Sequence, residues 1–170
     1  MKLTTERLFI RTLQSTDWQD MGNIFRDFSQ SPYAVYDHPM PTREEDIKAL
    51  TARFSENGLF FAVFPKGGGN MLGYVCFHQV EDTLDMGYCF HSSSQGQGIA
   101  TESCRALMRY FQDQQGVHRF SAGTAMENHP SFRLLERLGF VCVSTESLSF
   151  HKDSQGDPIS FLGGNFIFQG

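Results

Sequence analysis

Apolar positions along the chain recur with two different spacings. About four segments, which begin near Asp17, Thr42, Gly98 and His129, repeat apolar residues every three or four positions and predict amphipathic helices. The segments between them are short and rich in β-branched and aromatic residues, and turn residues bound them, as is typical of strands. The strands expected on this basis cover residues 8–13, 59–64, 71–80, 84–91, 118–124, 140–151 and 158–168.

The order of these elements is β-α-α-β-β-β-α-β-α-β-β, which predicts an α/β (α+β) protein with helices packed on a sheet. Asp17 is expected to cap the first helix, and Thr42-x-x-Glu45 reads as a capping box for the second. Asn128 is expected to cap the last helix, which ends at Gly139. No repeat or linker divides the chain, so residues 1–170 are expected to form a single domain.

The segment from His91 to Glu102 is polar and rich in glycine, and it joins a predicted strand to a predicted helix. The first backbone N–H groups of a helix lack partners and lie at the positive end of its dipole, so such a turn can bind a phosphate or pyrophosphate. Gly96 and Gly98 would let the backbone approach such a ligand closely. A plain flexible turn is the alternative, because Gly-x-Gly alone is a weak signal.

Two motifs in the chain resemble those of the GNAT superfamily of N-acetyltransferases. Gln95-x-x-Gly98-x-Ala100 is similar to the family's Gln/Arg-x-x-Gly-x-Gly/Ala pyrophosphate signature. Asn128-x-x-Ser131, followed by Leu138-Gly139-Phe140, resembles its second motif. The opening Thr5-Glu6-Arg7-Leu8 is common in RimJ/RimL-type members. The resemblance covers essentially the whole chain.

This resemblance implies the GNAT fold, a mixed, twisted, mostly antiparallel sheet of six to seven strands flanked by about four helices. Strands 84–91 and 118–124 would splay apart into a central wedge that admits acetyl-CoA, the acyl donor. Tyr88 to Phe90 would pair through their backbone with the pantetheine, and residues 95–101 would hold the pyrophosphate. The expected cofactor-binding residues are Tyr88, Cys89, Phe90, Gln95, Gly96, Gln97, Gly98, Ile99, Ala100, Thr101, Asn128 and Ser131.

Asp85 and Ser131 are the expected catalytic residues. Acetyl transfer needs a neutral amine, a stabilised carbonyl oxygen and a departing thiolate. Asp85 stands where many relatives carry a Glu, which suggests a base acting through water; a strand-edge carboxylate is the alternative, and His78 and His91 are further candidates. Leu135 occupies the place of the Tyr that many GNAT enzymes use as acid. Ser131 is then expected to hydrogen-bond the thiolate or relay a proton, although a helix-capping role alone would also explain it.

In the family, the segment between the two N-terminal helices lines the acceptor side. The substrate-binding candidates there are Tyr33, Tyr36, Asp37 and His38. An aromatic and acidic lining suits a cationic amine, such as a peptide N-terminus, a polyamine or an aminoglycoside, and the resemblance favours a protein or peptide α-amine. Because Asp85 and Leu135 depart from the common pattern, a non-catalytic acyl-CoA-binding sensor or scaffold stays as the alternative.

Composition narrows the partners and the location. A net charge of -5 without a dense Lys/Arg block argues against nucleic acid. No apolar run approaches the roughly eighteen residues of a membrane span, and no signal-peptide pattern opens the chain. Four widely spaced cysteines without a Cys-x-x-Cys pair predict reduced thiols in a cytoplasmic protein and no metal site. Both a monomer and a homodimer remain open.

Overall fold

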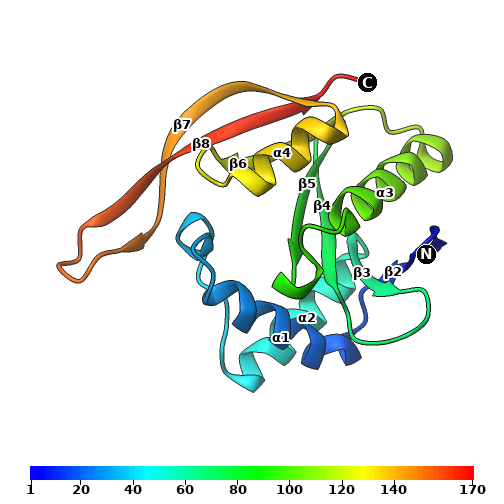
Figure 1. Ribbon diagram of the computed structural model, residues 1–170, viewed down its shortest axis with the longest axis horizontal. Helices are drawn as coiled ribbons and strands as arrows, with labels where there is room; N and C mark the ends of the chain where they lie inside the picture. The colour runs from blue at the N-terminus through cyan, green and yellow to red at the C-terminus, as the bar shows by residue number, and fades with distance from the viewer.

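The computed structural model describes residues 1–170 and contains one eight-stranded sheet with helices on both faces (Figure 1). The strand order is β1-β2-β3-β4-β5-β6-β8-β7, and all neighbours are antiparallel except β5 and β6. The strands are β1 (Lys2–Thr4), β2 (Leu8–Thr12), β3 (Phe60–Pro65), β4 (Gly73–Val80), β5 (Thr83–Phe90), β6 (Phe120–Ala125), β7 (Phe140–Lys152) and β8 (Pro158–Phe168). The predicted fold class is confirmed.

The sheet exceeds the predicted six to seven strands because of β1, which the sequence analysis did not identify. β1 pairs antiparallel with β2, and Leu3 on β1 packs against the core. Three residues are too short a run to show the period-2 alternation from which a strand is recognised. The pairing with β2 therefore defines this strand, and its local sequence does not.

Two helices cover each face of the sheet (Figure 1). α1 (Trp18–Ser29) and α2 (Glu44–Asn57) enclose a cluster of 10 buried apolar residues, whereas α3 (Ile99–Gln115) and α4 (His129–Leu138) enclose one of 21. Cys104, Leu107 and Phe111 of α3 are fully buried, as the spacing of the sequence predicted. Three 3-10 turns, η1 (Ser15–Asp17), η2 (Ala34–Tyr36) and η3 (Ser92–Ser94), complete the helical elements.

The helix caps agree only in part with the sequence. The side chain of Asn128 accepts a hydrogen bond from the Ser131 N–H, so the predicted cap of α4 is confirmed. The predicted Thr42–Glu45 capping box is wrong, because α2 begins one residue later and Arg43 stands at its N-cap without a side-chain cap. Asp17 does stand at the N-cap of α1, but its carboxylate binds the Arg11 guanidinium and the Gln14 N–H and caps no N–H of α1.

The parallel pair β5–β6 is short and forms the predicted wedge. Its register holds only Leu84 opposite Phe120 and Asp85 opposite Ser121. Beyond these residues the two strands separate, while β5 stays paired with β4 as far as Phe90. One backbone edge of β5 is therefore left without a strand partner.

The β7–β8 hairpin reaches past the body of the molecule to the segment between α1 and α2 (Figure 1). The ring of His151 on β7 donates to the carbonyl oxygen of Asp37 at 2.7 Å. Phe161 on β8 packs edge-on against Tyr36, with ring centroids 5.2 Å apart. The hairpin thus holds the predicted acceptor-side segment in place.

Candidate functional site

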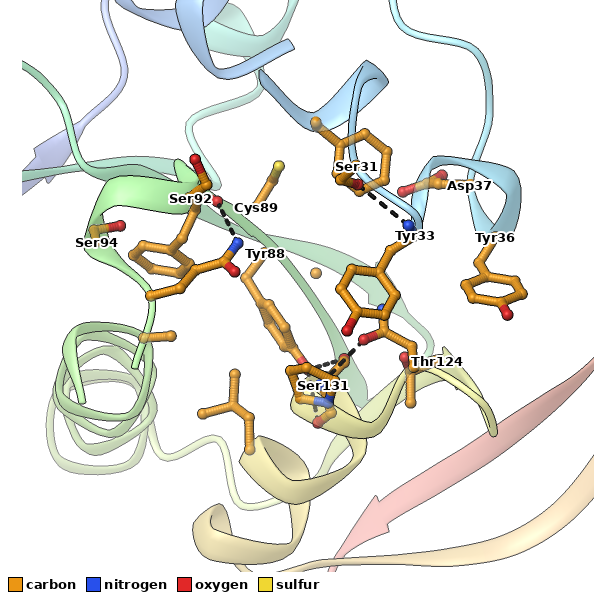
Figure 2. A pocket seen from close by; sticks show the side chains of 18 of the residues that line it. Ser31, Tyr33, Tyr36, Asp37, Tyr88, Cys89, Ser92, Ser94, Thr124 and Ser131 are labelled. Atoms are coloured by element: carbon orange, nitrogen blue, oxygen red, sulfur yellow. Dashed lines mark hydrogen bonds between the residues drawn. The ribbon is translucent and has the colours of Figure 1, made fainter. Parts of the chain in front are cut away.

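A cavity of about 780 Å³ opens where β5 and β6 separate. Its walls come from the segment after α1, from β5, from the loop that leads into α3, from β6 and from the start of α4. Figure 2 shows Tyr33, Tyr36 and Asp37 on one side of this cavity, across from Thr124 and Ser131. The volume lies within the usual range of roughly 300–1,000 Å³ for sites that bind small molecules.

The glycine-rich segment that begins at His91, called the glycine loop below, ends at Gly98. Gly98 is the N-cap of α3, and its backbone is left-handed with φ +76°. The first helical hydrogen bond of α3 runs from the Glu102 N–H to the Gly98 carbonyl at 3.0 Å. The N–H groups of Ile99, Ala100 and Thr101 therefore have no helical acceptor, and these three residues line the cavity. The loop offers the row of donors that suits an anionic group.

Arg7 and Glu102 hold this loop, a role that the sequence analysis did not identify. The Arg7 Nη1 donates to the Gln97 carbonyl at 2.8 Å, and the Arg7 Nε donates to the Glu102 carboxylate at 2.7 Å. Thr5 donates to the same carboxylate. Burial opposes ionisation of Glu102, but the hydrogen bonds from Thr5 and Arg7 outweigh it and lower the pKa of this carboxyl. The opening Thr5-Glu6-Arg7-Leu8 segment thus acts on the loop directly.

Asp27 at the end of α1 holds the other side of the loop. Its carboxylate accepts from the Ser92 N–H at 2.8 Å and from the Ser92 hydroxyl at 2.6 Å. His91, a candidate base in the sequence, directs Nε2 to Asp27 at 3.5 Å and Nδ1 to the Ser93 hydroxyl at 2.8 Å. His91 is absent from the cavity lining.

Tyr88 and Ser131 meet in the cavity, across the wedge. The Tyr88 Oη lies 2.7 Å from the Ser131 Oγ, and Figure 2 shows the phenol directed at the first turn of α4. Burial raises the pKa of Tyr88, and the hydrogen bond with Ser131 lowers it by less. The sequence predicts a role at the site only for the backbone of Tyr88, and no local signal points to its hydroxyl.

Asp85 lies at the closed end of the wedge and is absent from the cavity lining. Its carboxylate accepts a hydrogen bond from the Ser121 hydroxyl at 2.7 Å. His78 stands directly opposite Asp85 on β4 and is exposed. The structure therefore brings together Asp85, Ser121 and His78, and it places them apart from Tyr88 and Ser131.

Of the predicted substrate-binding residues, Tyr33, Tyr36 and Asp37 line the cavity and His38 does not. The ring of His38 packs against Phe150 of the hairpin, with centroids 4.2 Å apart. Partial burial and then the charge of Glu127 raise the pKa of the Tyr36 phenol. Glu127, just before α4, is thus a second carboxylate beside the predicted segment that the sequence analysis missed.

Arg137 and Cys89 also line the cavity. Arg137, near the end of α4, is the one Arg or Lys in the lining. Its position in the sequence is equally typical of a cation that stabilises the C-terminus of a helix, so the sequence did not mark it as a site residue. Cys89 also lines the cavity, but burial raises the pKa of its thiol to about 12. At neutral pH this thiol is protonated and is a poor nucleophile.

All four cysteines are free thiols, and no cluster of three or more His, Cys, Asp and Glu side chains is placed to hold a metal ion. None of the helices combines the length and the apolar character that crossing a lipid bilayer requires.

Comparison with known proteins gives consistent matches. The acetyltransferase (GNAT) domain family matches residues 7–141. The uncharacterized N-acetyltransferase YnaD of Bacillus subtilis (strain 168) is 30% identical over 142 residues, 82% of each chain. The ribosomal protein uS5-alanine N-acetyltransferase of Escherichia coli (strain K12) is 28% identical over 151 residues, 82% of this chain and 78% of that one. The structure of RimL, a ribosomal L7/L12 α-N-protein acetyltransferase in complex with coenzyme A, superposes with a TM-score of 0.78 at 18% identity, covering 99% of this chain and 98% of that chain.

Proposed function

The chain belongs to the GNAT family of acetyltransferases, and we propose that it moves the acetyl group of acetyl-CoA to the α-amine of a protein or peptide N-terminus. The observation that carries this proposal is the cavity between β5 and β6. This cavity combines three features: the free strand edge of β5, the free N–H groups at the start of α3, and the acidic and aromatic side chains of Tyr33, Tyr36 and Asp37. These three parts suit the pantetheine, the pyrophosphate and a cationic acceptor, respectively.

The donor side follows from the backbone. The free edge of β5, from Met86 to Phe90, can pair with an extended pantetheine chain as an added strand would. The N–H groups of residues 99–101 would bind the pyrophosphate, and Arg137 supplies a positive charge for a phosphate group. Asn128 and Ser131 line the wall from which α4 begins, so they would face the acyl end of the donor.

The reaction is a direct transfer in one site. The amine nitrogen bonds to the thioester carbon, the C–S bond breaks, and the amine loses a proton. Backbone N–H groups of Tyr88 to Phe90 are the candidates that stabilise the carbonyl oxygen, and the Ser131 hydroxyl would donate a hydrogen bond to the departing sulfur. The protonated Cys89 thiol argues against an acetyl-cysteine intermediate.

Asp85 is our candidate for the proton acceptor. Because its carboxylate lies outside the cavity lining and binds Ser121, it would reach the amine through at least one water. A carboxylate in this position would assist the reaction through its negative charge and by accepting the amine proton from the intervening water.

Asp37, with Tyr33 and Tyr36, is our candidate for the amine-binding surface. A carboxylate and aromatic faces attract an ammonium group, and Glu127 adds negative charge beside Tyr36. The names of the uS5-alanine enzyme and of RimL point to protein N-termini as acceptors for those relatives. We place the protein in the cytosol, where free thiols such as these four persist.

The test is release of coenzyme A thiol in the presence of acetyl-CoA and one acceptor at a time. The acceptors are peptides that copy the N-termini of ribosomal proteins, the same peptides with a blocked α-amine, a polyamine and an aminoglycoside. We expect turnover with free peptides alone, and mass spectrometry should place the acetyl group on the α-amine. Binding of acetyl-CoA without release for any acceptor would instead identify a sensor or scaffold, and turnover with the small amines alone would contradict a peptide acceptor.

A further inference from the structure

We propose that Tyr88 is a positioning residue for the leaving group. Its phenol donates to the Ser131 Oγ and so directs the Ser131 proton toward the departing sulfur. The inference rests on the proposed function, because it assumes that the sulfur of acetyl-CoA lies beside Ser131.

The contact joins the two walls of the wedge. Tyr88 comes from β5 and Ser131 from the first turn of α4, and both line the cavity (Figure 2). The Oη–Oγ distance of 2.7 Å is that of a well-formed O–H···O hydrogen bond. The Ser131 backbone is itself fixed, since its N–H donates to the Asn128 side chain at 3.3 Å. The remaining freedom of Ser131 is the rotation of its hydroxyl.

The phenol is the donor in this pair on chemical grounds. A phenol is a stronger acid than an aliphatic alcohol, so it is the better donor, and the serine oxygen has two lone pairs with which to accept. When one lone pair is filled by Tyr88, the serine proton must point away from the Tyr88 Oη. Burial keeps the phenol protonated, because it raises the pKa of Tyr88 above its ordinary value of 10.0. The donor is therefore present throughout the working pH range.

Tyr88 supplies a phenol to a site that lacks the tyrosine common in the family, because Leu135 stands at that position. Leu135 on α4 is fully buried in the core and contributes nothing to the cavity. Tyr88 brings a hydroxyl from the opposite wall and contacts Ser131, which stands four positions before Leu135 on the same helix. The phenol at this site therefore comes from β5, whereas in many GNAT enzymes it comes from the helix that corresponds to α4.

Tyr88 supplies a hydrogen bond and keeps its proton. A phenol with an ordinary pKa of about 10 is a weaker acid than a thiol at about 8.5, so proton transfer from Tyr88 to the thiolate is uphill. The amine proton leaves through the base or water, and the thiolate departs with a hydrogen bond from Ser131. Neither hydroxyl changes its protonation state over the cycle.

The kinetic test is a double-mutant cycle with Tyr88→Phe, Ser131→Ala and the pair. We expect Tyr88→Phe to lower kcat by about three- to tenfold, the scale of one hydrogen bond, with the KM for acetyl-CoA unchanged. In the Ser131→Ala background the same change should have no further effect. Tyr110→Phe, on α3 and outside the cavity lining, is the matched control and should leave kcat unchanged. Multiplicative effects of the two substitutions on kcat would overturn the proposal.

A second readout needs no acceptor and so separates this inference from the proposed function. The thiol of bound coenzyme A is titrated by the ultraviolet absorbance of its thiolate, in the parent and in the folded variants. A hydrogen bond from Ser131 stabilises the thiolate, so Ser131→Ala and Tyr88→Phe should raise the pKa of the bound thiol by similar amounts. If Ser131→Ala raises it and Tyr88→Phe does not, Tyr88 does not position Ser131. If neither variant changes it, Ser131 does not contact the sulfur and the inference also fails.

Discussion

The guanidinium of Arg7 lies 2.6 Å from the carboxylate of Glu102 and joins the start of β2 to the first turn of α3. Because Arg7 also donates to the Gln97 carbonyl, one side chain fixes both the end of the glycine loop and the helix that follows it. The pair is only partly buried, with 47% and 21% of the two side chains exposed, so its direct contribution to folding stability is about 1 kcal/mol or less. Its main effect is to hold the loop in shape before a ligand binds.

Arg7→Ala should weaken acetyl-CoA binding by about three- to tenfold and leave kcat at saturating donor nearly unchanged, because the loop must then be ordered on binding. Arg7→Lys should recover little of the lost affinity for acetyl-CoA, since an ammonium group cannot reproduce the forked contact with Gln97 and Glu102. Isothermal titration calorimetry with acetyl-CoA measures the change. Arg53→Ala, which removes an exposed arginine from α2, is the control and should bind as the parent does.

Glu102 should make the stability of the loop depend on pH. Its folded-state pKa lies below the ordinary value of 4.5, so its stabilising effect is full above pH 4.5 and is lost as the pH falls through the folded-state pKa. The melting temperature of the parent should therefore fall more steeply below pH 4.5 than that of Glu102→Gln, which lacks the ionised partner. Equal slopes for the two proteins, by differential scanning calorimetry, would contradict this assignment.

Gly98→Glu should abolish acetyl-CoA binding, because a carboxylate would lie beside the proposed pyrophosphate site. Gly98→Ala separates backbone strain from charge. The left-handed φ of +76° disfavours any side chain, and a Cβ would also lie 3.4 Å from the Arg7 guanidinium. Gly96→Ala is the matched control, with φ +71° and no atom near its Cβ. Gly98→Ala should bind more weakly than Gly96→Ala, and equal affinities would show that the Arg7 contact is unimportant.

Features that depend on neighbouring residues could be predicted from the sequence. The strand, glycine loop and helix around Gly98, and the caps of α4 at Asn128 and Gly139, follow from local spacing and local hydrogen bonds. The wrong capping box at Thr42 shows the limit of such signals, since a helix can begin one residue later when no side chain caps it.

Features that depend on tertiary contacts could not be predicted. The Tyr88–Ser131 and Arg7–Glu102 contacts join residues that are 43 and 95 positions apart, and no periodicity encodes them. The exclusion of Asp85 from the cavity lining depends on the register at which β5 meets β6, and this register cannot be read from either strand alone. The strand edge and the glycine turn were thus identifiable, whereas the side-chain pairs that support them were not.

The cysteines should differ sharply in reactivity. Burial raises the pKa of Cys76 and of Cys89 to about 12, and Cys104 is fully buried, whereas Cys142 on β7 is exposed. Because the thiolate is the reactive form, iodoacetamide at neutral pH should label Cys142 first in the native protein. Mass spectrometry should then count four labelled cysteines after denaturation without a reductant. An internal disulfide, or early labelling at Cys89, would contradict this order.

Asp85→Asn tests the proton-transfer step of the proposed mechanism. An amide oxygen can still accept the hydrogen bond from Ser121, so this variant removes the charge and the basicity while preserving the contact. If Asp85 takes the amine proton through water, kcat should fall within the roughly hundredfold-to-ten-thousandfold range of a lost general base. Ser131→Ala should lower kcat only about tenfold, the scale of one hydrogen bond. The comparison is made at saturating acetyl-CoA with both variants folded. If Asp85→Asn retains near-parental activity, the carboxylate serves the strand pair β5–β6 alone, and the amine must lose its proton to water.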